Sequence, residues 1–154
     1  MSTQEITNYI KVNDEFVTGG QPTEEQLKAA AGEGFTSVIN LGTLNPRYAL
    51  KDEAGLAASL GLTYYHIPVA WEDPKESDFW AFEAAMRQRP PGKTLLHCAA
   101  NFRATAFYGL YALKNLGWSE AEADAFREPV WKGSHEPVWE KFIADMKARL
   151  RRPG

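Results

Sequence analysis

The stretch from Lys93 to Trp118 constrains the fold most strongly, because it contains the pattern of a strand, a tight turn and a helix in immediate succession. The apolar run 94–96 follows two prolines and a glycine, which is typical of a buried strand. Beyond the turn, apolar side chains recur at helical spacing; they are Phe107, Leu110, Tyr111 and Leu113. A buried strand that leads directly into a helix is a building unit of α/β folds.

The turn itself carries the only cysteine of the chain, Cys98, and Arg103 follows five positions later. A thiolate is favoured at the positive end of a helix dipole. The backbone amides of such a turn can wrap an anion, which a guanidinium then grips with two parallel hydrogen bonds. Asn101 is a residue type that tolerates left-handed backbone, so we expect it to bend the loop. A free cysteine is most often an unreactive core residue, but Arg103 does not fit a core, and we predict a nucleophile beside an oxyanion cradle.

Length and composition indicate one globular domain, residues 1–154, with 44% apolar and 24% charged residues. The net charge of −3 argues against a general affinity for nucleic acid or for an anionic membrane. One cysteine excludes an internal disulfide and suits a reducing compartment, so we expect a cytoplasmic protein. The first residues do not form a signal pattern, and the apolar runs are too short to span a membrane. Neither a cofactor nor a metal is expected, since His66, His97 and His135 lack ligand neighbours at metal-binding spacing.

Strand and helix patterns alternate along the whole chain. Strands are predicted at 9–12, 15–17, 36–41, 62–69 and 94–96, the first two as a hairpin or as two edge strands. Besides the helix after Arg103, helices are predicted at 24–31, 49–60, 76–89, 119–126 and 137–150. This alternation predicts an α/β three-layer sandwich, with a central, mostly parallel sheet and helices on both faces. In such a sheet the loops after Leu41, Val69 and His97 meet at the carboxyl edge, where the site is expected.

Two further patterns near the carboxyl end call for an interpretation. The tetrapeptide EPVW occurs twice, at 128–131 and 136–139, and we interpret the pair as chance or aromatic packing because two copies do not make a repeat architecture. Basic side chains cluster at the end of the last predicted helix, where they match its dipole; they are Lys147, Arg149, Arg151 and Arg152.

The segment HCAANFRAT resembles the signature HC-x-x-G-x-x-R-[ST] of cysteine-dependent protein tyrosine and dual-specificity phosphatases. More closely, the chain is similar to the bacterial phosphatase-like family related to the beta-lactamase-hydrolase-like proteins. Supporting segments are GGQPTEEQL, SVINLG and GLTYYHIPVAW, so that the resemblance spans roughly residues 9–118.

The loop departs from this signature in length. Four residues separate Cys98 from Arg103 where the usual phosphatase loop has five, and Asn101 occupies the position of the glycine. A four-residue loop is the spacing of rhodanese-type sulfurtransferases, whose smaller cradle holds a persulfide or sulfane sulfur. It offers fewer inward amides, although members of the bacterial family resemble this chain in sharing a shortened loop.

The resemblance implies hydrolysis of a phosphate monoester, of phosphotyrosine-like or other small type, through a phosphocysteine on Cys98. Arg103 and the loop 99–102 would stabilise the equatorial oxygens, and Thr105 would donate a hydrogen bond to the sulfur. His97 is expected to orient the loop. The residues expected to contact the substrate are His97, Ala99, Ala100, Asn101, Phe102 and Trp71.

A phosphate ester also needs an acid that protonates the leaving oxygen, and related phosphatases carry it on the loop after the Val69 strand. Asp73 is the first choice for this general acid and Glu72 the second, while Asp78 is assigned to stabilising the start of a helix. Trp71, with Tyr48 or Tyr65, is a candidate for the wall of a pocket that binds an aromatic ester. Arg47 is a candidate for a positive charge at the mouth of that pocket.

Three functions therefore stay open at the level of the sequence. A phosphatase acting on a phosphorylated protein or small molecule requires both Cys98 and a loop acid. A sulfurtransferase or persulfide carrier requires Cys98 alone and would carry extra sulfur on it. A pseudo-phosphatase would bind phosphate, which raises its melting temperature, without turnover.

Overall fold

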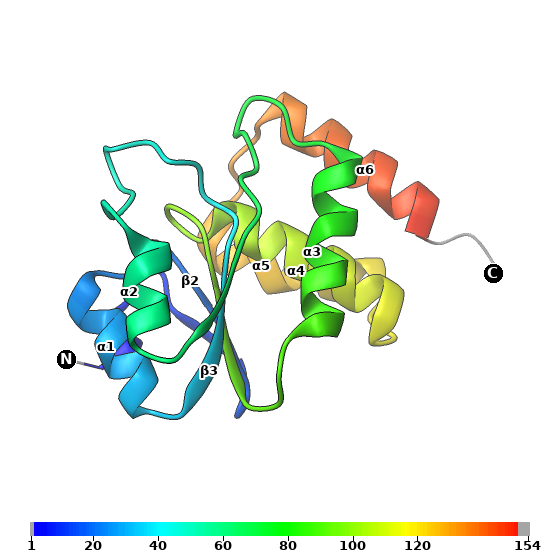
Figure 1. Ribbon diagram of the computed structural model, residues 1–154. Coiled ribbons are helices and arrows are strands. Elements are labelled where there is room, and N and C mark those ends of the chain that lie inside the picture. Colours follow the sequence, from blue (N-terminus) through cyan, green and yellow to red (C-terminus); the bar gives the residue numbers. More distant parts are fainter. Residues whose placement is uncertain (1, 151–154) are drawn as a thin grey trace.

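A computed structural model describes residues 2–150 (Figure 1). Its strands are β1 (Ile10–Asn13), β2 (Phe16–Gly19), β3 (Phe35–Asn40), β4 (Thr63–His66) and β5 (Lys93–His97). Its helices are α1 (Glu24–Gly32), α2 (Glu53–Ser59), α3 (Glu76–Gln88), α4 (Phe102–Asn115), α5 (Glu120–Trp131) and α6 (Pro137–Leu150), after a short 3-10 turn at Thr3–Glu5. Arg151 and Arg152 lie outside the described residues.

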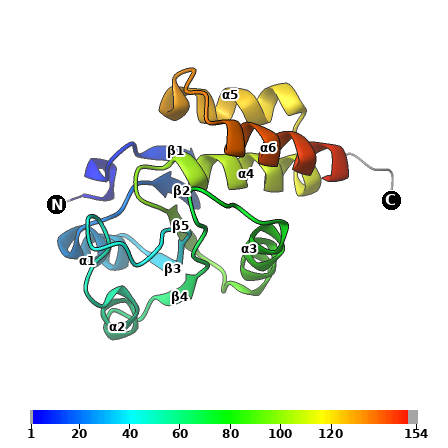
Figure 2. The same ribbon diagram turned by 90° about the horizontal axis from the view of Figure 1, so that it is seen from above.

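The five strands form one sheet in the order β1-β2-β5-β3-β4, and only the β1-β2 pairing is antiparallel. Viewed from above, the sheet has α1 and α2 on one face and α3 and α4 on the other, with α5 and α6 outside α4 (Figure 2). The expected α/β sandwich with a mostly parallel sheet is confirmed. The first two strands form a hairpin, but β2 is an interior strand, because it also pairs with β5 and is buried throughout.

A separate apolar cluster lies on each face of the sheet. Leu27, Val38, Ala57 and Leu95 belong to the cluster beneath α1 and α2. The larger cluster joins α3, α4 and α6 to the other face through fully buried aromatic rings; these include Phe79, Phe82, Phe107 and Trp139. The two clusters fix the sheet between its helices, and therefore fix the loops at its edge.

Pairing across the sheet brings the carboxyl ends of four strands level. Gly19 pairs with His97, His97 with Asn40, and Asn40 with His66. The segments that continue from these residues therefore leave the same edge together, as predicted for the loops after Leu41, Val69 and His97.

Three elements differ most in length from the sequence prediction. Helix α2 begins at Glu53 rather than near Ala49, because the Asp52 side chain caps it by accepting a hydrogen bond from the Gly55 amide at 3.0 Å. Strand β4 ends at His66, although the chain stays bonded to its neighbour up to Val69. Helix α5 continues past Pro129 to bury Trp131, whereas the pattern predicted an end near 126. None of the helices within residues 2–150 has both the length and the apolar character needed to cross a lipid bilayer.

Candidate active site

A cavity of about 720 Å³ opens at the carboxyl edge of the sheet. Four segments line it: Thr43, Asn45 and Tyr48 after β3; Ala70, Trp71 and Glu72 after β4; Cys98, Ala99, Ala100, Phe102 and Arg103 after β5; and Ser134 and Glu136 between α5 and α6. The three loops that the sequence predicted to meet thus line one cavity, and a fourth segment completes its wall. A second cavity, of about 670 Å³, lies at the opposite end of the sheet beside Phe16 and Arg89.

The loop 98–101 is held to the body of the protein through its carbonyl groups. His97 Nδ1 lies 3.2 Å from Cys98 O, Gln21 N donates to Ala99 O at 2.9 Å, and Asn8 Nδ2 donates to Ala100 O at 2.9 Å. With the carbonyls turned outward, the opposite side of each peptide faces inward.

Several backbone amides of this loop are left for a ligand. Within the described residues, the N–H groups of Ala99, Ala100, Phe102 and Arg103 donate to no protein acceptor, whereas the Asn101 N–H takes part in the β-bridge between Gly20 and Ala100. The last of them belong to the first turn of α4, whose dipole also favours a negative charge. The loop and the helix start together form an anion cradle, because free donors and the positive end of the dipole coincide.

Asn101 gives the loop its bend, as predicted. Its backbone is left-handed, with φ of 72°, and it immediately precedes α4. Its buried Nδ2 donates to Asn8 O at 2.7 Å and to Thr18 Oγ1 at 3.1 Å. Asn101 therefore acts as a structural anchor of the loop, since its side chain is turned toward β2 and the segment before β1.

Gly20 permits the close approach of the loop to the end of β2. A Cβ atom placed on Gly20 would lie 2.6 Å from Ala99 O and 3.1 Å from Ala100 Cα. Backbone atoms cannot yield as a flexible side chain can, so the segment GGQP after β2 is a packing requirement of the loop.

We expect Gly20→Ala to lower the free energy of unfolding by about 1–3 kcal/mol and to weaken phosphate binding, because the added methyl group pushes the loop away. Urea unfolding and phosphate titration measure the two effects. Gly32→Ala is the matched control, since a Cβ atom there meets nothing within 4 Å. Equal unfolding midpoints and equal phosphate affinities for the two variants would contradict this account of the loop.

Cys98 and Arg103 share the cavity, as the sequence predicted. Cys98 is 1% exposed and lies on the cavity wall, at the start of the cradle. Arg103 is 5% exposed, and its Nη1 donates to Val69 O at 2.7 Å while its Nη2 donates to the Tyr48 hydroxyl at 3.4 Å. These two bonds fix the plane of the guanidinium and leave its other N–H groups for an anion.

Tyr48 holds the far side of this clamp. Its hydroxyl oxygen accepts from Thr43 N at 2.9 Å and lies 2.7 Å from Thr43 Oγ1. Burial alone would raise the pKa of Tyr48, but the hydrogen bonds from Thr43 and Arg103 and the charge of Arg103 outweigh it, so that the pKa is lowered. The sequence suggested Tyr48 only as a wall; the structure makes it a partner of Arg103.

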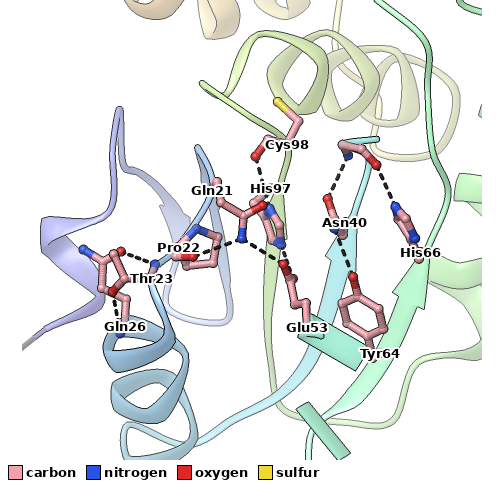
Figure 3. Close-up of polar contacts among 11 residues, drawn as sticks. Gln21, Pro22, Thr23, Gln26, Asn40, Glu53, Tyr64, His66, His97 and Cys98 are labelled. Carbon is pink, nitrogen blue, oxygen red and sulfur yellow. Dashed lines mark hydrogen bonds and ion pairs between the residues drawn. The ribbon is translucent and has the colours of Figure 1, made fainter. Parts of the chain in front are cut away.

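His97 lies beneath the cavity, not in its wall. Its Nε2 is 2.6 Å from Glu53 Oε2, and Glu53 Oε1 accepts from Gln21 Nε2 at 2.8 Å (Figure 3). Both ring nitrogens of His97 face oxygen atoms, and these two contacts fix the orientation of the ring. Burial would raise the pKa of Glu53, but the hydrogen bond and charge of His97, the Gln21 amide and the charge of His66 outweigh it and lower the pKa.

The Cys98 sulfur points away from this buried network (Figure 3). His97 therefore supports the loop by its contact with Cys98 O, as expected, and does not line the cavity as a substrate-binding residue. Glu53 was not singled out from the sequence. It is separated from His97 by 44 positions, and no local pattern links the two residues.

The loop after β4 brings one of its two carboxylates to the cavity. Glu72 lines the cavity, whereas Asp73 does not and pairs instead with Lys75. The order of preference taken from the sequence, Asp73 before Glu72, is therefore not the order that the geometry supports. Asp78 accepts a hydrogen bond from Lys75 N at 3.0 Å at the start of α3, in agreement with its expected role.

Thr105 does not face the sulfur. Its buried hydroxyl donates to Asn101 O at 2.8 Å and lies 3.1 Å from Phe102 O, so its single hydrogen holds the first turn of α4. The expected hydrogen bond from Thr105 to Cys98 is therefore not formed. Thr105 lies one position beyond the hydroxyl residue of the usual signature, and one helical residue turns a side chain to another side of the helix. Arg47 is exposed, and neither it nor Tyr65 lines the cavity.

Aromatic side chains wall the cavity next to Glu72. Trp71 and Phe102 both line it and contact each other edge to face, with ring centroids 6.0 Å apart. Ser134 and Glu136 complete the rim, and sequence reasoning missed both because only the folding of α5 and α6 over α4 brings them there. Within residues 2–150, no cluster of three or more potential metal ligands occurs.

Comparison with known proteins finds solved structures that are similar to this one. The solved structure of a DUF442 protein from Shewanella putrefaciens, described as a candidate phosphatase, matches with a TM-score of 0.86 and 33% identity over 97% of each chain. The phosphatase Tk-PTP in its active form matches with a TM-score of 0.74 at 18% identity, covering 92% of this chain and 97% of that one, which shows a common fold.

A partial match extends the comparison to longer proteins. The beta-lactamase hydrolase-like protein of Xylella fastidiosa is 31% identical over 104 residues, 66% of this chain. This chain spans about a quarter of that relative, since the match covers 24% of its length. No family model matches the chain. The likeness to the Shewanella protein extends over nearly all of both chains, and the chain therefore belongs to the DUF442 family.

Proposed function

We propose that this protein hydrolyses phosphate monoesters through a phosphocysteine intermediate on Cys98. The observation that carries the proposal is the cradle of four unpartnered amides, at 99, 100, 102 and 103, which shares one cavity with Cys98 and Arg103. A phosphoryl group presents three equatorial oxygens in the transition state, and the amides and the guanidinium are the donors it requires.

In the first step, the Cys98 thiolate attacks phosphorus in line with the ester oxygen, so that a P–S bond forms as the P–O bond breaks. Protonated Glu72 donates its proton to the departing oxygen. In the second step, water attacks phosphorus, the Glu72 carboxylate takes a proton from that water, and the P–S bond breaks to release inorganic phosphate. Cys98 returns to the thiolate.

The cavity wall supports a small or aromatic ester as substrate. Trp71 and Phe102 offer ring surfaces beside Glu72, and Phe102 also starts α4 directly after the cradle. Arg103 is the only basic side chain among the lining residues, whereas Glu72 and Glu136 are acidic. A monoester with a neutral, aryl-like remainder, such as a phosphotyrosine-like group, suits this lining better than a polyanion does.

The experiment that tests the proposal is rapid acid quenching of the enzyme during turnover of an aryl phosphate, followed by mass spectrometry. A phosphoryl group on the peptide that contains Cys98 is the expected result. Turnover without such an adduct in single-turnover experiments, or phosphate binding without turnover above background, would contradict the proposal; the latter would make the protein a pseudo-phosphatase.

We expect Glu72→Gln to lower kcat for an aryl phosphate with a poor leaving group by about 10²–10⁴-fold, because no proton then reaches the ester oxygen. Asp73→Asn is the matched control, and it should change kcat by less than about three-fold, since Asp73 lies outside the cavity lining. Steady-state kinetics over a pH series measures both variants. A larger loss in Asp73→Asn than in Glu72→Gln would reverse the assignment.

Sulfur transfer is a second candidate, favoured by the four-residue spacing between Cys98 and Arg103. The Cys98 thiolate would attack the outer sulfur of thiosulfate, breaking its S–S bond, releasing sulfite and leaving a persulfide on the protein. Mass spectrometry after incubation with thiosulfate would show one extra sulfur on Cys98. This route needs no acid at position 72, so equal sulfur loading of wild type and Glu72→Gln distinguishes it from ester hydrolysis.

A further inference from the structure

The indole N–H groups of the two tryptophans in the repeated EPVW segment each donate to a different loop of the site. Trp131 Nε1 donates to Phe102 O at 3.1 Å and also lies 3.2 Å from Thr105 Oγ1, at the first turn of α4. Trp139 Nε1 donates to Trp71 O at 2.7 Å, in the residue that precedes Glu72. Trp131 is 2% exposed and Trp139 is fully buried, so both hydrogen bonds form away from water.

Ring contacts of the two tryptophans add to the hydrogen bonds that their indole N–H groups make with the loops. Trp71 stacks on Trp131 with centroids 5.8 Å apart and on Trp139 with centroids 5.4 Å apart. Trp131 also contacts the Phe102 ring, at 5.0 Å. The loop that carries Glu72 and the loop that ends at Phe102 are therefore packed against the same pair of side chains.

Neither hydrogen bond is required to complete a helix or a strand. Within the described residues, Trp71 O accepts only from Trp139, so removing that indole N–H leaves a peptide carbonyl in the aromatic cluster without a protein donor. Trp131 supplies its donor at the point where the cradle becomes helix α4. These contacts set the positions of the two loops. Misplacement of a catalytic group by about 1 Å costs as much as 10²-fold in rate.

We propose that Trp131 and Trp139 are positioning residues, of which Trp131 holds the anion cradle and Trp139 holds the acid loop. Helices α5 and α6, which lie outside α4 in Figure 2, then fix the placement of Glu72 relative to Cys98. The kinetic part of this inference rests on the proposed function. The inference assigns to the segment 119–150 the role of positioning both loops of the site.

Phenylalanine variants test the two assignments separately, because each keeps a ring and removes the N–H group. Trp139→Phe should lower kcat/KM for phenyl phosphate about 10–100-fold, while kcat/KM for dinitrophenyl phosphate, whose leaving group needs no proton, changes by less than about three-fold, because kcat/KM reports only the steps up to departure of the ester oxygen. Trp131→Phe should weaken inorganic phosphate binding about 3–10-fold and affect the two esters alike. A ratio of two substrates within one sample does not depend on the fraction of folded enzyme.

Trp118→Phe is the matched control, since Trp118 packs on Tyr108 and Phe126 between α4 and α5, away from both loops. It should leave the ester ratio and phosphate affinity unchanged. Equal losses on both esters in Trp139→Phe, or the same behaviour in all three variants, would overturn the positioning roles and leave only a contribution to packing.

A readout without turnover separates this inference from the proposed function. Hydrogen exchange should rise in the segment 70–74 of Trp139→Phe and in the segment 98–104 of Trp131→Phe, and in neither segment of Trp118→Phe. If the wild type fails to hydrolyse aryl phosphates, the proposed function is wrong, yet this exchange pattern still decides whether each tryptophan holds its own loop. Exchange that rises equally in both segments of both variants would refute the separate assignments.

Discussion

Replacing Cys98 by serine should lower the hydrolysis of an aryl phosphate by about 10⁴-fold or more, because a serine hydroxyl in this position has no general base that would activate it. The free loop amides and the start of α4 supply donors for an anion at this position. The serine variant keeps those donors and nearly the same side-chain volume. We therefore expect it to retain the fold and to bind inorganic phosphate with an affinity within a few-fold of the wild type.

Steady-state kinetics and phosphate titration on the same preparations check this prediction. Arg103→Lys is a useful companion, because it keeps the charge but loses the planar donors that contact Val69 and Tyr48. Removal of one such transition-state donor costs about 10²–10³-fold. If Cys98→Ser retains wild-type turnover, the phosphocysteine mechanism is wrong, whatever the phosphate affinity.

The second large effect concerns stability. Glu53→Gln should lower the free energy of unfolding at neutral pH by about 3 kcal/mol, because it removes the charge that faces buried His97 at 2.6 Å. Burial raises the pKa of Glu53, but His97 and Gln21 outweigh it, so the folded-state pKa lies below the ordinary value of 4.5. A carboxyl with a lowered pKa stabilises the fold above its unfolded-state pKa, and that stability is lost as the pH falls through the folded-state value.

The difference between wild type and Glu53→Gln should therefore be full at neutral pH and should shrink as the pH falls below about 4.5. Urea unfolding at a series of pH values measures it. Glu83→Gln is the matched control: Glu83 is also buried and bonded to Lys114 and Asn115, but it lies between α3 and α4, outside the site network. It should lower stability without changing phosphate affinity. A stability difference for Glu53→Gln that grows with falling pH would contradict the charge assignment.

The organisation of the fold and the centre of the site could be predicted from the sequence because their signals are local. The strand, turn and helix around Cys98 lie within one short stretch, and the left-handed bend at Asn101 follows from a side-chain preference. The meeting of the loops followed from the parallel sheet, since its carboxyl ends must share an edge.

The remainder of the site depends on contacts between distant segments. Glu72 and Asp73 are neighbours of the same charge, and only the path of the loop, which Trp139 holds through Trp71 O, turns one of them toward the cavity. Glu53 and His97 meet because α2 follows β3, the strand that pairs directly with β5. Likewise, the roles of the EPVW tryptophans exist only after α5 and α6 fold over α4.

The attachment of the cradle to Asn8 has a consequence for shortened versions of this protein. Asn8 precedes β1, yet its side chain donates to Ala100 O and its carbonyl accepts from Asn101 Nδ2. A version trimmed to begin at Ile10 would lose Ile6 from the apolar cluster beneath α1 and α2 but would keep all five strands and six α-helices, so its circular dichroism would look native. It would nevertheless have lost the brace that keeps the loop in shape, so intact secondary structure is a poor guide to whether an engineered fragment can still capture an oxyanion.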